Sequence, residues 1–367
     1  MKIAFLSTFY PYRGGIAQFN GALYRAIEEK YKVKAFNFSL QYPKALFPGT
    51  TQLVSDEDKV DEIPSVRVLN AMNPATYMTT VKRIKEFKPD VLIIGYWMPY
   101  MAPALGYVAK KMGSHCRVIS IVHNAIPHEQ GQLDKTLSNY FFKRNTHCIA
   151  LSNAVKNDIQ ASYPEIKTKV LLHPVYEHFG NEVNRSEAAA KLGLDSSKKY
   201  LLFFGLIRDY KGLDQLLLAM KELDEAVHLI VAGEVYGDFD KYETIIKENE
   251  LSRRVHLNLN YISDEMVKYF FSLASTVVLP YKSGTQSGII AIAKHFNKPI
   301  VATDVGGLSE FIQHETEGLI VPPNDIKELA NAINKMLKII HITPADRPSA
   351  YNWDDFVEEM LEFMISE

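Results

Sequence analysis

One stretch in the second half of the chain joins an apolar run, a glycine and two cations. The run from Tyr200 to Phe204 predicts a buried strand, and Gly205 ends it. Arg208 and Lys211 follow, and an amphipathic helix is expected over 213–223. The first N–H groups of a helix are unpaired and lie at the positive end of its dipole. This order of residues therefore predicts an anion site, with phosphate as the expected anion.

Strand-like and helix-like segments alternate along nearly the whole chain, which predicts parallel sheets covered by helices. The predicted strands are 3–6, 32–38, 90–95, 118–122, 147–151, 170–172, 200–204, 227–232, 255–257, 276–279, 299–303 and 318–321. The clearest predicted helices are 17–29, 74–87, 102–112, one capped by Ser152, 213–223, 289–295 and 353–365. The pattern indicates an α/β fold with two doubly wound domains.

The segment 176–198 is polar and mixed, without strand character, and we place the boundary between the domains there. The predicted domains are residues 1–180 and 181–349, and the segment 40–65 is expected to be irregular. Doubly wound domains bind ligands at the carboxyl ends of their strands. If the two domains face each other, a ligand lies in the cleft between them.

Composition excludes several classes of protein. The length of 367 residues suits two domains, and a net charge of −2 gives no sign of a nucleic-acid partner. The two cysteines, Cys116 and Cys148, have no metal-like spacing, and Cys148 is expected to be a buried free thiol. We expect no signal peptide, and no apolar run approaches the ~20 residues of a membrane span. These features predict a cytoplasmic protein that is at most peripheral to a membrane.

Three further loops of the second half fall at predicted strand ends. The loop at 280–288 offers neutral hydrogen bonds from Thr285, Gln286 and Ser287 and ends at Gly288, where a helix begins. The other two carry Gly306-Gly307 and Gly233-Glu234. Glycines let a backbone approach a ligand closely. The alternative for the first loop is an ordinary helix cap, and for Arg208 and Lys211 a solvated turn.

The first half carries two candidate features. Gly14 and Gly15 form a glycine-rich turn before the predicted helix 17–29. His123 follows the predicted strand 118–122, where it can bond a sugar hydroxyl or share a proton. A purely structural histidine is the alternative.

Taken together, these motifs resemble those of GT-B glycosyltransferases of family 4, also called group 1. The matching residues are Gly205, Arg208, Lys211-Gly212, Gly233-Glu234, the segment 299–310, the segment 318–323, Gly14-Gly15 and His123. The resemblance covers essentially the whole chain and implies two Rossmann-like domains that face a cleft. It also implies that the last helix, within 350–367, packs back on the N-terminal domain.

The resemblance implies a retaining transfer of a sugar from a UDP- or GDP-sugar to an acceptor hydroxyl. Arg208 and Lys211 would hold the diphosphate and stabilise the departing nucleoside diphosphate, and His123 would lie near the donor sugar. Gly14, Gly15, the Gly205 and Gly233-Glu234 turns, and the loop Thr285 to Gly288 would complete the donor site. No metal and no cofactor are expected.

One departure from the family is clear. The family usually carries two glutamates eight positions apart, and here Gly284 and Ile292 occupy those positions. The sequence has no acidic residue between Glu265 and Asp304. The chain therefore resembles a subgroup with a Gln-Ser-Gly loop, and the ribose-binding role stays unassigned.

The acceptor side gives weaker signals. The segments 43–49, 96–100 and 127–129 are candidates, and Trp97 could stack on a sugar or belong to the core. Basic clusters at 82–88, 110–111 and 143–144 could contact an anionic membrane that carries a lipid-linked acceptor, or could be solvated helix faces. Two other functions stay open: a nucleotide-sugar epimerase of the same architecture and a catalytically silent binding subunit.

Overall fold

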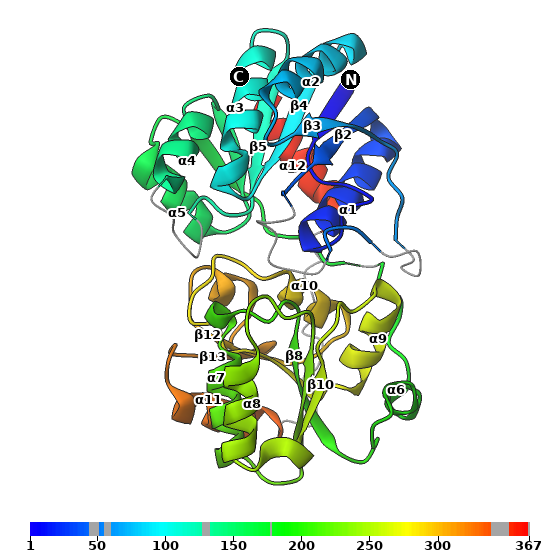
Figure 1. Cartoon of the computed structure of the whole chain (residues 1–367), viewed down its shortest axis with the longest axis vertical. Helices are drawn as coiled ribbons and strands as arrows, with labels where there is room; N and C mark the ends of the chain where they lie inside the picture. The colour runs from blue at the N-terminus through cyan, green and yellow to red at the C-terminus, as the bar shows by residue number, and fades with distance from the viewer. Residues whose placement is uncertain (44–50, 55–59, 127–132, 177, 339–351, 366–367) are drawn as a thin grey trace. The chain divides into compact units, whose positions relative to one another are not determined.

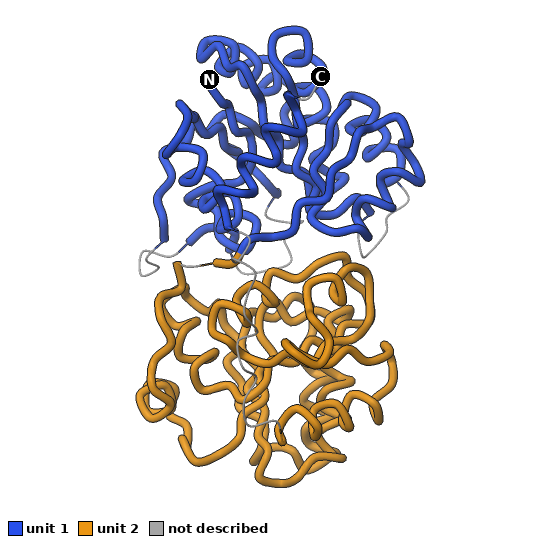
Figure 2. The backbone as a smooth tube through the Cα atoms, turned by 180° about the vertical axis from the view of Figure 1, so that it is seen from behind, with its two compact units in different colours: residues 1–56, 60–174, 351–367 blue, residues 57–59, 175–350 orange. Residues whose placement is uncertain are grey.

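The computed structural model describes residues 1–43, 51–54, 60–126, 133–176, 178–338 and 352–365. The chain forms two compact units (Figure 2). Unit 1 comprises residues 1–56, 60–174 and 351–367, and unit 2 comprises residues 57–59 and 175–350. The first long crossing between the units falls after Pro174, just before the mixed segment in which the sequence analysis placed the boundary.

Unit 1 is built on a seven-stranded sheet of order β3-β2-β1-β4-β5-β6-β7 (Figure 1). The strands are β1 (Lys2–Leu6), β2 (Lys32–Leu40), β3 (Ser65–Asn70), β4 (Val91–Tyr96), β5 (Arg117–Val122), β6 (His147–Ala150) and β7 (Lys167–Val170). The helices are α1 (Gly15–Lys30), α2 (Pro74–Phe87), α3 (Ala102–Met112), α4 (Asp134–Phe142), α5 (Asn153–Ser162) and α12 (Trp353–Ile365). All paired strands are parallel.

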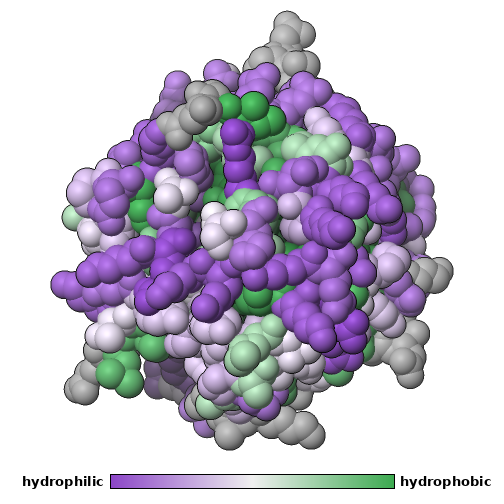
Figure 3. Space-filling view, turned by 90° about the horizontal axis from the view of Figure 1, so that it is seen from above, coloured by the Kyte–Doolittle hydropathy of each residue, from purple (hydrophilic) through white to green (hydrophobic). Residues whose placement is uncertain are grey.

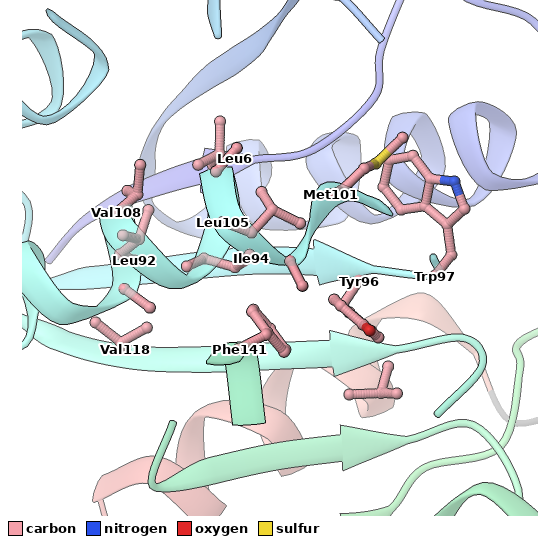
Figure 4. Packing of buried hydrophobic residues seen from close by; sticks show 14 of the residues in the cluster. Leu6, Leu92, Ile94, Tyr96, Trp97, Met101, Leu105, Val108, Val118 and Phe141 are labelled. Atoms are coloured by element: carbon pink, nitrogen blue, oxygen red, sulfur yellow. The ribbon is translucent and has the colours of Figure 1, made fainter. Parts of the chain in front are cut away.

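Side chains alternate between the two faces of this sheet and form two cores. On one face, Leu6, Leu92 and Ile94 pack against α2, α3, α4 and α5, as Figure 4 shows for part of this core. On the other face, Ile3 and Ile93 pack against α1 and α12. A parallel sheet buried on both faces explains why its strands read as continuous apolar runs.

Unit 2 contains a six-stranded parallel sheet of order β10-β9-β8-β11-β12-β13. The strands are β8 (Lys199–Phe204), β9 (Val227–Ala232), β10 (Val255–Asn258), β11 (Thr276–Leu279), β12 (Ile300–Thr303) and β13 (Gly318–Val321). The helices are α6 (Arg185–Leu192), α7 (Leu213–Ala219), α8 (Asp240–Glu248), α9 (Asp264–Leu273), α10 (Gly288–His295) and α11 (Ile326–Met336). Helices α7, α8 and α11 share one core with the sheet, and Figure 1 shows α9 and α6 on its other side.

The predicted α/β class with two doubly wound domains is confirmed, but several details differ. The predicted helix 213–223 is two pieces, because α7 ends at Ala219 and continues as the 3₁₀ helix η4 (Met220–Glu222). Strand β3 was not predicted, and it begins at Ser65, the last residue of the segment predicted to be irregular. Helix α6 lies in the mixed segment 176–198, where Asn184 caps it by accepting a hydrogen bond from the Glu187 N–H at 2.8 Å.

Charged residues make up 23% of the chain, and a hydrophilic surface is expected from this content. The face in Figure 3 is mainly hydrophilic, and hydrophobic residues appear on it as separate patches. Within the described ranges, no helix combines the length and the apolar character needed to cross a bilayer.

Gly212 shows how tightly the loops of unit 2 are packed. It connects the 3₁₀ helix η3 (Asp209–Lys211) to α7 with a φ of 70°. A Cβ at this position would overlap the carbonyl oxygen of Pro280. Gly193, at the end of α6, has a similar φ of 67° but nothing within 4 Å of its Cβ position.

We expect Gly212→Ala to destabilise unit 2 more than Gly193→Ala. Both substitutions cost about 1–2 kcal/mol for a left-handed alanine, and only the first adds a clash with backbone. Urea unfolding followed by circular dichroism measures the difference. Equal losses for the two variants would contradict the tight contact between Gly212 and Pro280.

Candidate functional site

The strand order of unit 2 brings two of the predicted loops together. The order reverses between β8 and β11, and ligands of such sheets bind at this reversal, beyond the carboxyl ends of the strands. Residues 205–212 follow β8 and residues 280–288 follow β11. The Lys282 N–H donates a hydrogen bond of 2.7 Å to the Tyr210 carbonyl. The predicted cationic turn and the predicted neutral loop are therefore neighbours.

Lys211 is a buried cation at this reversal. Its residue is 9% exposed, and Nζ lies 3.3 Å from the position that a Cβ on Gly205 would occupy. Nζ also lies 5.2 Å from the centre of the Tyr281 ring. Burial lowers the pKa of Lys211, and the nearby charge of Arg208 lowers it further. A side chain at Gly205 would crowd the ammonium group, which gives this glycine a role in the site.

Arg208 is the second cation of the turn. It is partly buried, and its guanidinium carbon lies 5.3 Å from the centre of the Tyr236 ring. In the described part of the chain, neither Arg208 nor Lys211 forms an ion pair with an acidic side chain. Both positive charges are thus open to an external anion.

The nearby carboxylates are already neutralised by other lysines. Asp209 pairs with Lys241 and, at 3.3 Å, with Lys282. Asp214 pairs with Lys282 at 2.8 Å. The hydrogen bond from Lys241 is the largest cause of the lowered pKa of Asp209. These pairs keep the carboxylates occupied beside the two unpaired cations.

The turn after β9 packs directly on the turn after β8. Gly233 has a φ of 150°, and a Cβ there would overlap the carbonyl oxygen of Gly205. The Ile207 N–H donates a 2.8 Å hydrogen bond to the carbonyl of Glu234, which is 6% exposed. The structure therefore brings Gly205, Gly233 and Glu234 together at one edge of the sheet.

The turn after β12 supports the loop after β11. Gly306 has a φ of 55°, and a Cβ there would overlap the carbonyl oxygen of Gly284. The Gly307 N–H donates a 3.1 Å hydrogen bond to the carbonyl of Thr285, which is 9% exposed. The two glycines predicted to approach a ligand thus approach this loop.

Tyr281 holds the end of the same loop. Its hydroxyl lies 3.1 Å from Oγ of Ser287, the residue before α10, and burial raises its pKa to about 12. The Tyr281 carbonyl accepts a 2.6 Å hydrogen bond from the Thr303 hydroxyl. Gln286 is partly buried, and α10 begins at Gly288. The first N–H groups of α10 follow this loop directly.

The two positions that carry glutamates in the family do not hold acids here. Gly284 belongs to the contact with Gly306, and Ile292 is 5% exposed on α10. Their replacement leaves a neutral loop beside the Arg208 and Lys211 pair.

In unit 1, the sheet order reverses between β1 and β4. Gly14 precedes α1 with a φ of 104°, a backbone conformation that favours glycine, and Gly15 is the first residue of the helix. A Cβ on either glycine would have nothing within 4 Å. The Asn20 amide anchors the helix by donating to Ser7 Oγ at 2.8 Å and to the Thr8 carbonyl at 2.9 Å.

His123 directly follows β5 and is 2% exposed. The backbone N–H of His123 donates a 2.9 Å hydrogen bond to the Tyr96 carbonyl. The centre of its ring lies 5.1 Å from that of Phe19, in an edge-to-face contact. Its Nε2 is buried and has no hydrogen-bond partner among the described residues. Burial lowers the pKa of His123 to about 3, with a contribution from His173. The imidazole is therefore neutral near pH 7.

The acceptor candidates that the structure describes are largely buried. Trp97 is 7% exposed, and its indole N–H donates a 2.9 Å hydrogen bond to the Tyr42 hydroxyl. Tyr96 is fully buried and stacks on Phe141. Both belong to the core of unit 1, so the stacking role considered for Trp97 is wrong. Residues 44–49 and 127–129 lie outside the described residues.

The sequence analysis missed the aromatic partners of the site. Tyr236, Tyr281 and Phe19 adjoin Arg208, Lys211 and His123. Each stands in an otherwise ordinary loop or helix, and the chain has 39 tyrosines and phenylalanines in all (20 Tyr and 19 Phe). The sequence carries no local signal that separates these three from the rest.

Two family models match the chain. Residues 184–343 match the model described as "Glycosyl transferases group 1", and residues 13–175 match "Glycosyltransferase Family 4". Together the two models account for most of both units. Residues 184–343 therefore belong to the group 1 glycosyltransferases, and residues 13–175 belong to Glycosyltransferase Family 4.

Individual relatives agree with this assignment. The chain is 26% identical to an uncharacterized glycosyltransferase of Methanocaldococcus jannaschii over 231 residues, and this alignment covers 58% of each chain. It is 26% identical to the lipopolysaccharide core biosynthesis mannosyltransferase LpsB of Rhizobium meliloti over 202 residues. This alignment covers 53% of this chain and 56% of the relative. The chain thus matches about half the length of these curated relatives.

Solved structures show the same fold. Anabaena HepE, crystallised with UDP-glucose, aligns over 100% of both chains with a TM-score of 0.79 and 19% identity. At this identity, the similarity establishes the GT-B fold with its two Rossmann-like domains.

We expect the free energy of unfolding to rise with pH between about 4 and 6.5. Burial lowers the pKa of His123 to about 3 and that of His173 to about 4, whereas an unfolded histidine has a pKa of about 6.5. The unfolded chain therefore binds more protons in this range, so stability is full above pH 6.5 and falls as the pH falls.

Each buried histidine contributes a slope of up to about 1.4 kcal/mol per pH unit. Urea unfolding at several pH values should show a smaller slope for His173→Gln than for the parent protein. The exposed His115→Gln variant controls for loss of an imidazole. A slope unchanged by His173→Gln would contradict the burial of a neutral ring.

Proposed function

We propose that this protein is a retaining glycosyltransferase that moves a sugar from a UDP- or GDP-sugar to an acceptor hydroxyl. The observation that carries the proposal is the pair Arg208 and Lys211, which lies at the reversal of strand order in unit 2 without a carboxylate partner among the described residues. A diphosphate suits this pair, because arginine can bind two phosphate oxygens and lysine adds a point charge. The relation to HepE, whose structure holds UDP-glucose, supports a nucleotide-sugar donor.

Sugar transfer places negative charge on the leaving diphosphate. Fixed cations lower the barrier when they meet charge that develops in the transition state. Lys211 acts at short range in a poorly solvated place, where its field is weakly screened. We infer that Arg208 and Lys211 stabilise the departing nucleoside diphosphate, and that the reaction needs no metal and no cofactor.

The loop after β11 suits a neutral role in donor binding. Thr285, Gln286 and Ser287 can hydrogen-bond the donor, and the N-terminus of α10 favours negative charge. In unit 1, Gly14 and Gly15 leave open space before α1. The unpartnered Nε2 of His123 fits a hydrogen bond with a hydroxyl of the donor sugar. This chain follows a Gln-Ser-Gly variant of the family pattern, in which these contacts replace those of the two glutamates.

The acceptor we propose is a sugar on a growing cell-surface polysaccharide or glycolipid. The relation to the lipopolysaccharide core mannosyltransferase of Rhizobium meliloti supports this class. A silent binding subunit is the second candidate, because both family glutamates are absent. A nucleotide-sugar epimerase is less well supported, since the loop at 280–288 contains no acid that could move a proton.

Turnover of a panel of UDP- and GDP-sugars tests the proposal. With a lipid-linked acceptor present, we expect sugar transfer with retention of the anomeric configuration, read by NMR of the product. An epimerase gives an isomerised sugar or free sugar regardless of acceptor. A silent subunit raises its melting temperature with a nucleotide-sugar but gives no product with any donor and acceptor pair.

Lys211→Ala should lower turnover at least about tenfold, because it removes charge from the leaving group. Exposed Lys221→Ala is the matched control and should leave turnover unchanged. Unchanged turnover in Lys211→Ala would overturn the diphosphate assignment.

We further propose that unit 1 contacts an anionic membrane surface through a groove between α2 and α3. The groove has a volume of about 460 Å³ and is lined by Met78, Val81, Lys82, Lys85, Glu86, Tyr107 and Lys111. Met78 is 66% exposed, although methionine is normally buried. Glu86, the acid at the groove, is paired with Arg83 at 3.2 Å. Apolar side chains rimmed by lysines suit an interface with anionic lipid.

Sedimentation with phosphatidylglycerol vesicles tests this surface. We expect Lys82→Glu with Lys111→Glu to lower the partition coefficient at least about tenfold, because each reversed charge repels the headgroups. Lys221→Glu with Lys327→Glu makes the same change of net charge on unit 2 and should bind as the parent does. Equal binding by the two double variants would contradict a docking role for the groove.

A further inference from the structure

Phe19 is the centre of a cluster of aromatic rings in unit 1. It lies on α1 shortly after the Gly14 and Gly15 turn and is 1% exposed. Four rings surround it in edge-to-face contacts. These are His123 at 5.1 Å, His173 at 5.0 Å, Trp353 at 5.2 Å and Phe356 at 5.7 Å. Edge-to-face contacts favour a fixed angle between the ring planes, because the positive edge of one ring meets the negative face of the other.

Two members of the cluster stand where the chain passes between the units. His173 comes one residue before the end of the unit 1 segment 60–174, and Trp353 lies near the start of the segment 351–367. These two rings also contact each other at 5.8 Å. His173 Nδ1 donates a 2.6 Å hydrogen bond to the carbonyl of Pro174, the last residue before the crossing. Phe19 therefore contacts rings from two distant parts of the unit 1 sequence, beside the boundaries at 174 and 351.

His123 depends on this packing for its orientation. Its buried Nε2 has no hydrogen-bond partner within the described ranges, so no polar contact of that atom fixes the ring. A buried polar atom without a partner is unfavourable and persists only where its surroundings enforce it. The edge-to-face contact with Phe19 is the ring contact that the described residues provide for His123.

We propose that Phe19 is a positioning residue that fixes the orientation of the His123 imidazole, because its ring packs on His123 and is itself held by His173 and Trp353. The inference rests on the proposed role of His123 as a contact of the donor sugar. Phe19 itself contacts no donor and acts through His123.

Phe19→Leu tests the inference, because leucine keeps the apolar character and removes the ring. We expect kcat to fall about tenfold or more while UDP affinity stays within about twofold, since a small misplacement slows the reaction without touching the phosphate site. NMR of ¹⁵N-labelled histidine should show shifted ring resonances of His123. Phe19→Tyr, which keeps the aromatic edge, should restore most of the turnover. The double variant with His123→Ala should be no slower than His123→Ala alone.

Phe142→Leu is the matched control. Phe142 is also fully buried in unit 1 and contacts three aromatic rings, but these are Tyr96, Phe141 and Tyr163. Phe142→Leu should lower the free energy of unfolding without shifting the His123 ring resonances. Unchanged His123 resonances in Phe19→Leu, or kcat within twofold of the parent, would overturn the positioning role. Full turnover in His123→Ala would instead remove the role of His123 itself, and the inference with it.

Discussion

The unpaired charge of Lys211 is the constraint on which the donor site depends. A cation that is nine-tenths buried loses hydration, and the protein supplies no carboxylate among its described residues to compensate. Lys282 and Lys241 occupy the nearby Asp214 and Asp209. The folded chain thus keeps a local excess of positive charge at the carboxyl edge of a parallel sheet. A bound diphosphate would supply the missing countercharge.

Backbone contacts between turns hold that charge in place. Gly212, Gly233 and Gly306 each bring one turn against a carbonyl of another, at positions where a side chain would collide. The turns after β8, β9, β11 and β12 therefore form one connected layer. In unit 1, a side chain makes the corresponding contact: Asn20 joins α1 to the residues just after β1. The two units reverse their strand order in the same way but build their edges from different contacts.

The sequence predicted what local patterns encode. Apolar runs marked most strands of both sheets. The cap at Ser152 is confirmed, since its side chain accepts from the Val155 N–H at 3.2 Å. It did not reveal that Gly306 packs on Gly284, because that contact joins turns that are separate in the chain. Nor did it separate Trp97, a core residue, from a sugar platform. Burial depends on neighbours such as Tyr42 that no local pattern identifies.

A calorimetric titration of the protein with uridine, UMP and UDP, and with the guanosine series, tests the central claim most directly. If Arg208 and Lys211 bind a diphosphate, affinity for the preferred base rises stepwise from nucleoside to diphosphate, and the gain from the second phosphate shrinks as salt screens the charges. A nucleoside that binds as tightly as its diphosphate would contradict the claim that these two cations form the phosphate site.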